Sequence, residues 1–447
     1  MAITLIFIMC VVSLFLWKRR VNFSGKFIFL FAAMWFLDVV LMSFDVYHVN
    51  GIRSTTMSLI IFSILLYILG YSLMKGYAEN KVKRAALLSS FDKRIESFSR
   101  NKALQLFYTV AIIIILTQFF KVLPLLLAEG HMGGGLRVEA LTGQLYSPLF
   151  YTFNNYLFSP LYRISLPLAG YFLITKKNLF TTFLTFIYCL LYPSLFGGRL
   201  SFFIFGFSVA LCYLWCKSFN VSIIRKDIKR IITTLSIAIV LLFTGMTIAK
   251  SGDVSDVKGS FEELKEDMVL QPLRYFVCPL KAFDYAIEHH YPSKLGGYMN
   301  GRATFASIDY DVNPVLNRMS GTHDPNANSI IGHLIQEEWI SLSSDVPSWN
   351  ALYTALLHFY IDFGVVGCLF FSFLFGVLTR WAINKMTLKV SLPYFVLAFF
   401  FMTMSFMSCF SYYPVGGDVL PFLLYIFIWI KLEKSSYVLL QRKRFVY

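Results

Sequence analysis

This chain of 447 residues has few charged side chains and no cysteine framework. Only 15% of its residues are Asp, Glu, Lys or Arg, whereas 57% are hydrophobic and 47 are Phe. A composition this poor in charge excludes a soluble globular domain. The seven Cys are scattered, with Cys278 alone in a polar segment, and none forms a Cys-x-x-Cys pair. The sequence therefore predicts neither a disulfide-bonded module nor a metal site, and the cysteines are expected to be packing residues.

Internal repeats are also missing from the sequence. No repeat with a period of about 20–50 residues is found, and no pair of interrupted hydrophobic segments recurs in two matching halves, as it does in many secondary transporters. These two absences weaken a transporter interpretation, which stays open as an alternative.

Long hydrophobic runs dominate the rest of the chain. A membrane-spanning helix needs about 20 apolar residues, and fewer where flanking side chains reach the interface. Eleven runs approach this length: Ala2–Trp17, Phe27–Phe44, Met57–Met74, Leu104–Leu127, Leu157–Thr175, Leu179–Phe196, Leu200–Cys216, Ile231–Ala249, Phe363–Leu378, Leu392–Phe410 and Val419–Ile430. The sequence predicts an all-α polytopic membrane protein with about eleven transmembrane helices, organised as a single domain over residues 1–447.

Positive charge is concentrated in alternate connections between these runs. Six segments hold 27 of the 40 Lys and Arg but only 5 of the 25 Asp and Glu: Lys18–Lys26, Lys75–Lys102, Lys176–Lys177, Lys217–Arg230, Arg380–Lys389 and the tail from Lys431. Because short positive loops stay on the cytoplasmic side, the N-terminus is predicted outside and the C-terminus inside. The net charge of +15 then reflects topology and contact with anionic lipid, so no nucleic-acid partner is expected.

The same topology places the one long polar segment, residues 250–350, outside the cytoplasm. Its Ser260-Phe-Glu-Glu263 pattern is typical of a capped helix start, and Ala282–His290 is predicted to be helical. Turn signals follow at Gly296-Gly297, Asn300-Gly301, Asn313-Pro314 and Asp324-Pro325. We expect a large loop of helices and ordered turns lying on the membrane face, and loops this long are usually functional when ordered.

Arginines near the predicted outer face are candidate anion-binding residues. Arg199 follows Gly197 and Gly198 at a hairpin turn, where the glycines leave room for a bulky anion beside the guanidinium. Arg163 lies near the same face and could join it. The alternative is that Arg199 only ends a membrane helix, with its charge in the interface.

Ionisable residues also gather late in the chain. The long loop contains Arg302, Arg318, His323, His333 and Glu338, and isolated residues of these types are mostly structural or solvated.

His358 and Asp362 stand four residues apart, hence on one helical face, directly before a membrane run. Such a pair at a membrane boundary is either a structural contact or part of an active site.

Three of these features together resemble the Wzy-type polymerases of bacteria, which join O-antigen or other oligosaccharide repeat units. They are the Arg199 turn, the long outer loop, and the stretch from Tyr353 to Gly376, with Tyr-Thr-Ala at its start, Asp-Phe-Gly-Val-Val-Gly from Asp362 and Phe-Leu-Phe-Gly at its end. The topology resemblance covers most of the chain, whereas the motif resemblance covers this last stretch.

The resemblance implies a metal-independent glycosyltransferase with the membrane fold called GT-C, without a cofactor, in the bacterial inner (cytoplasmic) membrane. Its substrates would be glycans linked to undecaprenyl pyrophosphate, polymerised on the periplasmic face, and a polysaccharide chain-length regulator is a candidate partner. Arg199, Arg302, Arg318 and Arg163 are then candidates for binding the pyrophosphate, which gains charge as the leaving group. His358, Asp362 and Glu338 are candidates for taking the proton from the acceptor hydroxyl.

Two alternatives share parts of this pattern. An O-antigen ligase-like glycosyltransferase would use the same donor chemistry. A flippase or other transporter of lipid-linked oligosaccharides would need the spans but not a large outer loop with several Arg and His.

The charge asymmetry predicts the result of reporter fusions. A reporter that is active only outside the cytoplasm is expected to be active after Ser251, Gly301 or Asn350 and inactive after Lys102 or Lys226. A reporter that is active only inside, fused at the same five positions, serves as the control and is expected to show the opposite pattern. Cytoplasmic labelling of the 250–350 segment would contradict the topology.

Overall fold

The computed structural model describes residues 11–12, 16, 22–44, 48–49, 51–74, 81–128, 146–175, 178–195, 200–219, 233, 274–337, 340–346, 349 and 352–444. The chain divides into two compact units. The first consists of Met1–Ala78, Gln271–Leu388 and Phe400–Leu423. The second consists of Glu79–Leu270, Lys389–Phe399 and Leu424–Tyr447.

The described residues are helices joined by turns and contain no strand, only an isolated bridge between Ile340 and Trp349. Six helical segments are long and apolar enough to cross a membrane: α2 (Phe23–Ser43), α3 (Ser54–Leu73), α5 (Lys102–Ala128), Pro148–Ile174, α10 (Leu200–Ser218) and α16 (Leu356–Lys389). Two shorter apolar helices are α9 (Leu179–Ser194) and α17 (Leu392–Met407). By length and composition the chain is a helical membrane protein.

The number of eleven spans stays a prediction. The expected runs Ala2–Trp17 and Ile231–Ala249 lie almost wholly outside the described residues. The last run, Val419–Ile430, forms the first part of α18 (Val419–Arg444). The six cysteines within the described ranges are all buried and form no disulfide, in agreement with their predicted packing role.

In the first unit, α3 packs closely against α16. A Cβ atom at Gly70 would overlap the carbonyl group of Phe373, and one at Gly376 would overlap the carbonyl group of Tyr67. Small residues at helix interfaces in membranes allow such close approach of two backbones. Helix α3 also contacts α2, because the ring of Tyr67 stacks on Phe31 with 4.0 Å between ring centroids. These contacts hold α2, α3 and α16 together.

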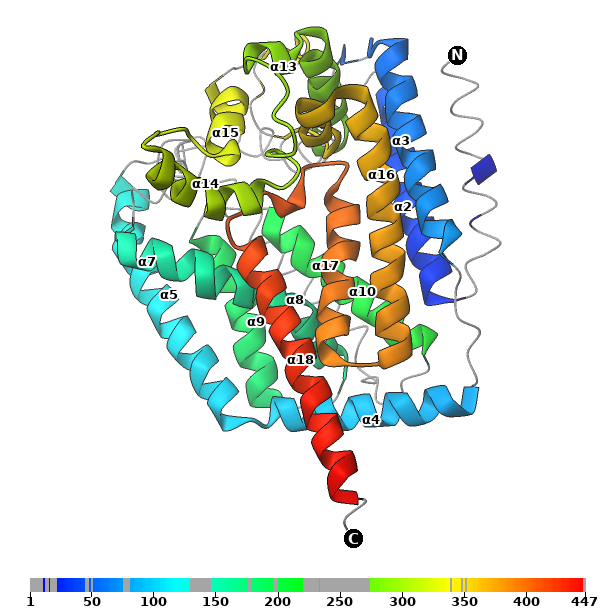
Figure 1. Cartoon of the computed structure of the whole chain (residues 1–447), viewed down its shortest axis with the longest axis vertical. Coiled ribbons are helices and arrows are strands. Elements are labelled where there is room, and N and C mark those ends of the chain that lie inside the picture. Colours follow the sequence, from blue (N-terminus) through cyan, green and yellow to red (C-terminus); the bar gives the residue numbers. More distant parts are fainter. Residues whose placement is uncertain are drawn as a thin grey trace, which may run out of the picture. The chain divides into compact units, whose positions relative to one another are not determined.

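The second unit is organised around α8 (Ser159–Ile174), which packs against α9 and α10, while α5 packs against α9. A short helix, α7 (Pro148–Phe153), and a π-helical turn, η2 (Asn154–Phe158), lead into α8. Part of the basic segment Lys75–Lys102 forms α4 (Lys81–Ser99), which in Figure 1 runs across the direction of α5. Phe91 of α4 is buried against the rings of Tyr171 and Trp215, and this cluster attaches the helix to its unit.

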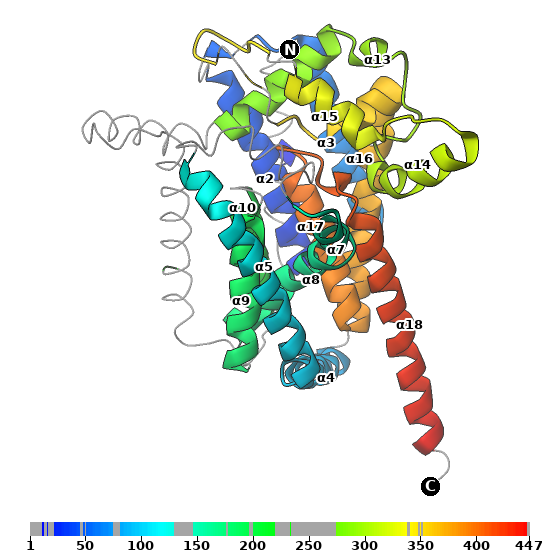
Figure 2. The same cartoon turned by 90° about the vertical axis from the view of Figure 1, so that its left-hand side faces the viewer.

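Between α3 and α16 in the chain, the first unit contains residues 274–355, here called the 274–355 segment. Its helices are residues 274–288, α13 (Tyr291–Lys294), α14 (Ala306–Ser320) and α15 (Ala327–Glu337). Figures 1 and 2 show α13, α14 and α15 at the end of the unit where α16 begins. The predicted helix Ala282–His290 is found as the second part of the 274–288 helix, whereas the predicted cap at Ser260–Glu263 lies outside the described residues.

The turn predicted at Asn313-Pro314 is wrong, because both residues lie inside α14. The amide groups of Asn313 and Asn317 both donate to the carbonyl oxygen of Asp324, at 2.7 Å each. These two bonds come from successive turns and require a continuous helix there. These contacts, to a residue 11 and 7 positions later in the chain, stabilise the helix against the local preference of the Asn-Pro pair for a turn.

A buried carboxylate attaches the 274–355 segment to α3. Asp284 is 1% exposed and accepts hydrogen bonds from the Thr56 hydroxyl at 2.6 Å and from Nε of Arg53 at 3.0 Å. The Arg53 side chain is more than a third exposed, so solvent weakens its ion pair. The bond from the Thr56 hydroxyl is buried, so solvent does not weaken it in this way.

Candidate functional site

Helix α16 is broken about two turns after it begins. Phe363 has φ −144° and Gly364 has φ +62° and ψ −148°, neither of which is helical. Glycine is required at Gly364, because its φ is positive and a Cβ atom would lie 2.9 Å from the Tyr298 hydroxyl. The break separates residues 356–362, which are buried, from the part of the helix whose side chains Phe363, Val365 and Val366 are exposed.

Asp362 bonds the 274–355 segment to this break. Its side chain is fully buried, and its two oxygens accept the backbone N–H groups of Ala303 at 3.0 Å and Thr304 at 2.5 Å. Next to this contact, the Met299 N–H donates to the carbonyl oxygen of Ile361 at 3.1 Å. Both oxygens are thus used to hold the 298–304 turn, and two buried N–H groups would lose their acceptor without them.

Tyr412 completes a buried polar cluster on the same side. Its hydroxyl donates to the carbonyl oxygen of Thr304 at 2.5 Å, and its ring lies 4.7 Å from the His358 ring, centroid to centroid. Burial, and after it the negative charge of Asp362, raises the pKa of the Tyr412 phenol. The phenol therefore stays protonated and acts as a donor. His358 and Asp362 both face Tyr412, as expected for residues on one helical face.

Three polar atoms of this region have no hydrogen-bond partner among the described residues. They are His358 Nδ1, Thr304 Oγ1 and Thr354 Oγ1, all in side chains that are at least nine-tenths buried. Buried polar atoms are nearly always paired, so each exception needs an explanation, such as a catalytic role or a bound water or ion. His358, Thr304, Thr354, Asp362 and Tyr412 are therefore the candidate functional site, called the polar cluster below.

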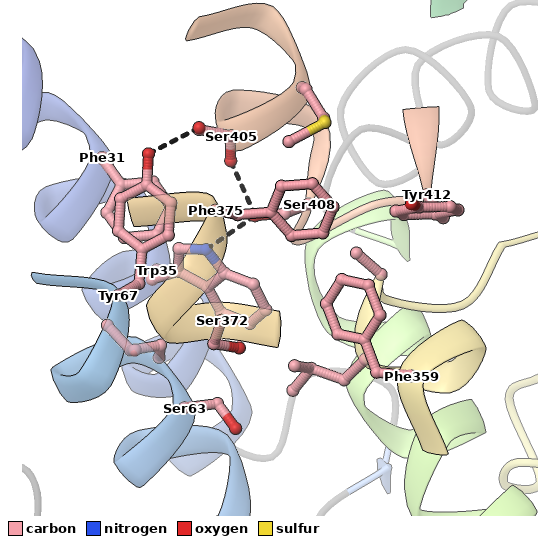
Figure 3. A pocket seen from close by; sticks show the side chains of 14 residues that line it. Phe31, Trp35, Ser63, Tyr67, Phe359, Ser372, Phe375, Ser405, Ser408 and Tyr412 are labelled. Atoms are coloured by element: carbon pink, nitrogen blue, oxygen red, sulfur yellow. Dashed lines mark hydrogen bonds between the residues drawn. The ribbon is translucent and has the colours of Figure 1, made fainter. Parts of the chain in front are cut away.

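A small apolar cavity lies next to the polar cluster, within the same unit. Figure 3 shows its walls: Phe31 and Trp35 from α2, Tyr67 from α3, Phe359 and Phe375 from α16, and Tyr412 at one side. Hydroxyl groups line it sparsely. Ser405 contacts the Tyr67 hydroxyl at 2.5 Å, and Ser408 accepts the Trp35 indole N–H at 3.1 Å. Because Tyr412 borders both, the cavity adjoins the polar cluster.

The expected pairing of His358 with Asp362 is not found. Both Asp362 oxygens are bonded to backbone amides, and His358 Nδ1 has no partner within the described part of the chain. The four-residue spacing does place His358 and Asp362 on one face of the helix. The backbone amides of Ala303 and Thr304, however, occupy the Asp362 carboxylate in place of the imidazole. Asp362 therefore acts as a positioning residue for the 298–304 turn instead of orienting the imidazole.

Three of the four predicted arginines lie within the described residues. Arg302 donates through Nε to Asp309 at 2.7 Å and through Nη2 to the carbonyl oxygen of Pro325 at 2.8 Å, so part of its donor set is occupied. Arg318 is exposed near the end of α14. Arg163 is half-buried in α8 of the second unit. Arg199 and Glu338 lie outside the described residues.

Tyr412 and Thr304 were not expected at the site. The only signal for Tyr412 was its position in a short polar connection, Ser411-Tyr-Tyr-Pro, directly after the tenth hydrophobic run. Thr304 follows the Asn300-Gly301 turn signal and is uncharged, so nothing in its pattern indicated a buried role. Within the described ranges, no three His, Cys, Asp or Glu side chains are grouped closely enough to hold a metal ion.

Substitution of Asp362 is expected to loosen the 298–304 turn. Asp362→Asn replaces one acceptor by an N–H₂ donor, which leaves a buried amide without a partner and costs about 1–3 kcal/mol. Amide hydrogen exchange at Ala303 and Thr304 should accelerate. Asp345→Asn is the control, because that exposed carboxylate bonds only to exposed groups and its loss should change stability by less than about 0.5 kcal/mol. Unchanged exchange at both amides in Asp362→Asn would contradict this role.

Comparison of the chain with protein-family models, with curated proteins and with solved structures finds no match. The polar cluster and the cavity beside it are therefore the features of the described structure that bear on function.

Proposed function

We propose that the protein is a membrane glycosyltransferase that polymerises undecaprenyl-pyrophosphate-linked oligosaccharide repeat units into a surface polysaccharide. The observation that carries the proposal is the polar cluster: a buried His with an unpartnered nitrogen, placed where the 274–355 segment meets a spanning helix. The sequence resemblance to Wzy-type polymerases supports the same function, since its motif begins at Tyr353 and includes Asp362.

The cluster has the groups that glycosyl transfer needs on the acceptor side. An acceptor hydroxyl becomes a nucleophile when a base takes its proton, and an imidazole with a free nitrogen is the commonest such base. In this proposal His358 accepts the proton at Nδ1, and the Tyr412 ring, 4.7 Å from the imidazole, restricts its orientation. Asp362 acts indirectly, by holding the 298–304 turn that closes the cluster.

The adjoining cavity suits a lipid-linked substrate. Its walls are mostly aromatic and aliphatic, and a hydrocarbon chain gains about 25 cal/mol for each Å² of apolar surface that it buries in such a site. In this proposal the lipid of the substrate occupies the cavity, and its glycan lies at the polar cluster. The pyrophosphate is assigned to the predicted arginines, of which Arg302 belongs to the 274–355 segment near Thr304.

The glycans of a deletion strain test the proposal directly. Without the protein, the surface lipid is expected to carry single repeat units and no longer chains, and the gene supplied in trans should restore them. A complete loss of glycan from the lipid core would instead indicate a ligase. Repeat units trapped on the cytoplasmic face would indicate a flippase. Either of these results would overturn the polymerase proposal.

The role of His358 is tested with purified protein and lipid-linked repeat units. His358→Ala removes the proposed base and should reduce turnover by about 10²–10⁴-fold, while substrate binding and the melting temperature stay close to wild type. His289→Ala is the matched control, because that exposed imidazole contacts only Tyr285 and should be dispensable. Wild-type turnover in His358→Ala would show that His358 is not the base. The proposed reaction would then still be tested by the glycans of the deletion strain.

A further inference from the structure

Helix α14 exposes a continuous apolar stripe. Ile308, Val312, Val315, Leu316 and Met319 are all exposed, with Val315 at 57% and Met319 at 80%. Their spacing of four, seven, eight and eleven residues from Ile308 places them on one face of a helix. Five large apolar side chains along one helix exceed what a scatter of single exposed residues explains.

The opposite face of α14 is attached to the rest of the 274–355 segment and to the first turn of α18. Asn313 and Asn317 donate to the carbonyl oxygen of Asp324, and the Ser307 hydroxyl accepts the Leu420 N–H at 2.8 Å. Asp309, at the edge of the stripe, accepts hydrogen bonds from Nε of Arg302 and from the Ala327 N–H. The orientation of the helix is therefore determined by bonds, and the apolar stripe faces outward as a fixed feature.

The stripe continues into the exposed apolar side of α16. Phe305, the residue before α14, is exposed, and its ring lies 5.9 Å from the ring of Phe371. Phe305 and Phe363 both border Gly301, with ring atoms at 3.6 and 3.7 Å from the position of a Cβ there. From Phe363 onward, α16 exposes Val366 and Phe370 as well. One apolar surface thus runs from the spanning helix onto α14.

The start of α14 lies beside the point on α16 at which exposed apolar side chains begin. Residues 356–362 of α16 are buried, and the exposed apolar side chains begin at Phe363, beside Phe305. Lipid-facing side chains of a spanning helix begin where the hydrocarbon core begins, so the start of α14 lies at that boundary. Figure 1 shows α14 running across the direction of α16, which is the direction of a helix lying in the plane of an interface.

We propose that α14 lies in the membrane interface, with its apolar stripe buried among the lipid acyl chains of the leaflet at the broken end of α16. The bilayer is the occupant because the stripe continues the lipid-facing side of α16, and both surfaces meet at the same level. Arg318 and Asp311, on the flank of the stripe, would then lie at the level of the headgroups. The proposal extends the proposed function and does not depend on it, since a lipid-attached segment is compatible with any activity of the polar cluster.

Single fluorescent labels on the full-length protein test this placement. Val315→Cys and Met319→Cys are exposed positions whose substitution should leave folding intact, and His323→Cys, in the exposed turn after α14, is the matched control. Each variant is labelled and reconstituted into phosphatidylcholine nanodiscs. The unsubstituted chain gives the labelling background, which should be low because its described cysteines are buried.

Two quenchers distinguish the possible occupants of the stripe. Phosphatidylcholine spin-labelled near the top of its acyl chain should quench the labels at residues 315 and 319 and not the label at residue 323, whereas aqueous iodide should do the reverse. Iodide quenching of all three labels would mean that the stripe faces water. Protection of residues 315 and 319 from both quenchers would mean that a protein covers it, either a second copy or another chain. Each of these two results would overturn the proposal.

Discussion

The two hydrogen bonds that Asp362 accepts attach the 298–304 turn of the first unit to helix α16. The carboxylate is fully buried at the break of α16, and the amides of Ala303 and Thr304 come from a part of the chain some 60 residues earlier. Without it, two buried donors would lack partners, at a cost of about 1–3 kcal/mol for each. Because Thr304 in turn accepts the Tyr412 hydroxyl, the positions of Tyr412 and of the His358 ring depend on the same contact.

The break at Gly364 makes this contact compatible with a membrane. Backbone polar groups in a bilayer must find partners within the protein, so a helix can be interrupted only where other elements satisfy it. Here the 298–304 turn supplies one such partner, since Met299 bonds the carbonyl group of Ile361, and Tyr298 packs against Gly364. The interruption therefore places polar side chains at the end of a span, where another element bonds part of the freed backbone.

The 274–355 segment is attached to the first unit at separate points with different chemistry. Asp284 bonds Thr56 at the start of α3, Asp362 bonds the 298–304 turn, and Ser307 bonds the first turn of α18. Lipid contact by α14 would add a fourth attachment that is apolar. Attachment at three separate points restricts how the described part of this segment can move relative to α3, α16 and α18.

The sequence alone determined the helical, membrane-spanning character of the chain, because long apolar runs can satisfy their backbone in lipid only as helices. It also identified His358 and Asp362, since ionisable residues beside a span are costly unless they are used or paired. Only the tertiary structure decided their partners. Asp362 bonds amides some 60 residues away, and the ring beside His358 belongs to Tyr412, which no local spacing connects to it. Pro314 lies within a helix although the sequence predicted a turn there, and Asn313 beside it bonds the carbonyl group of Asp324 in the connection that follows the helix.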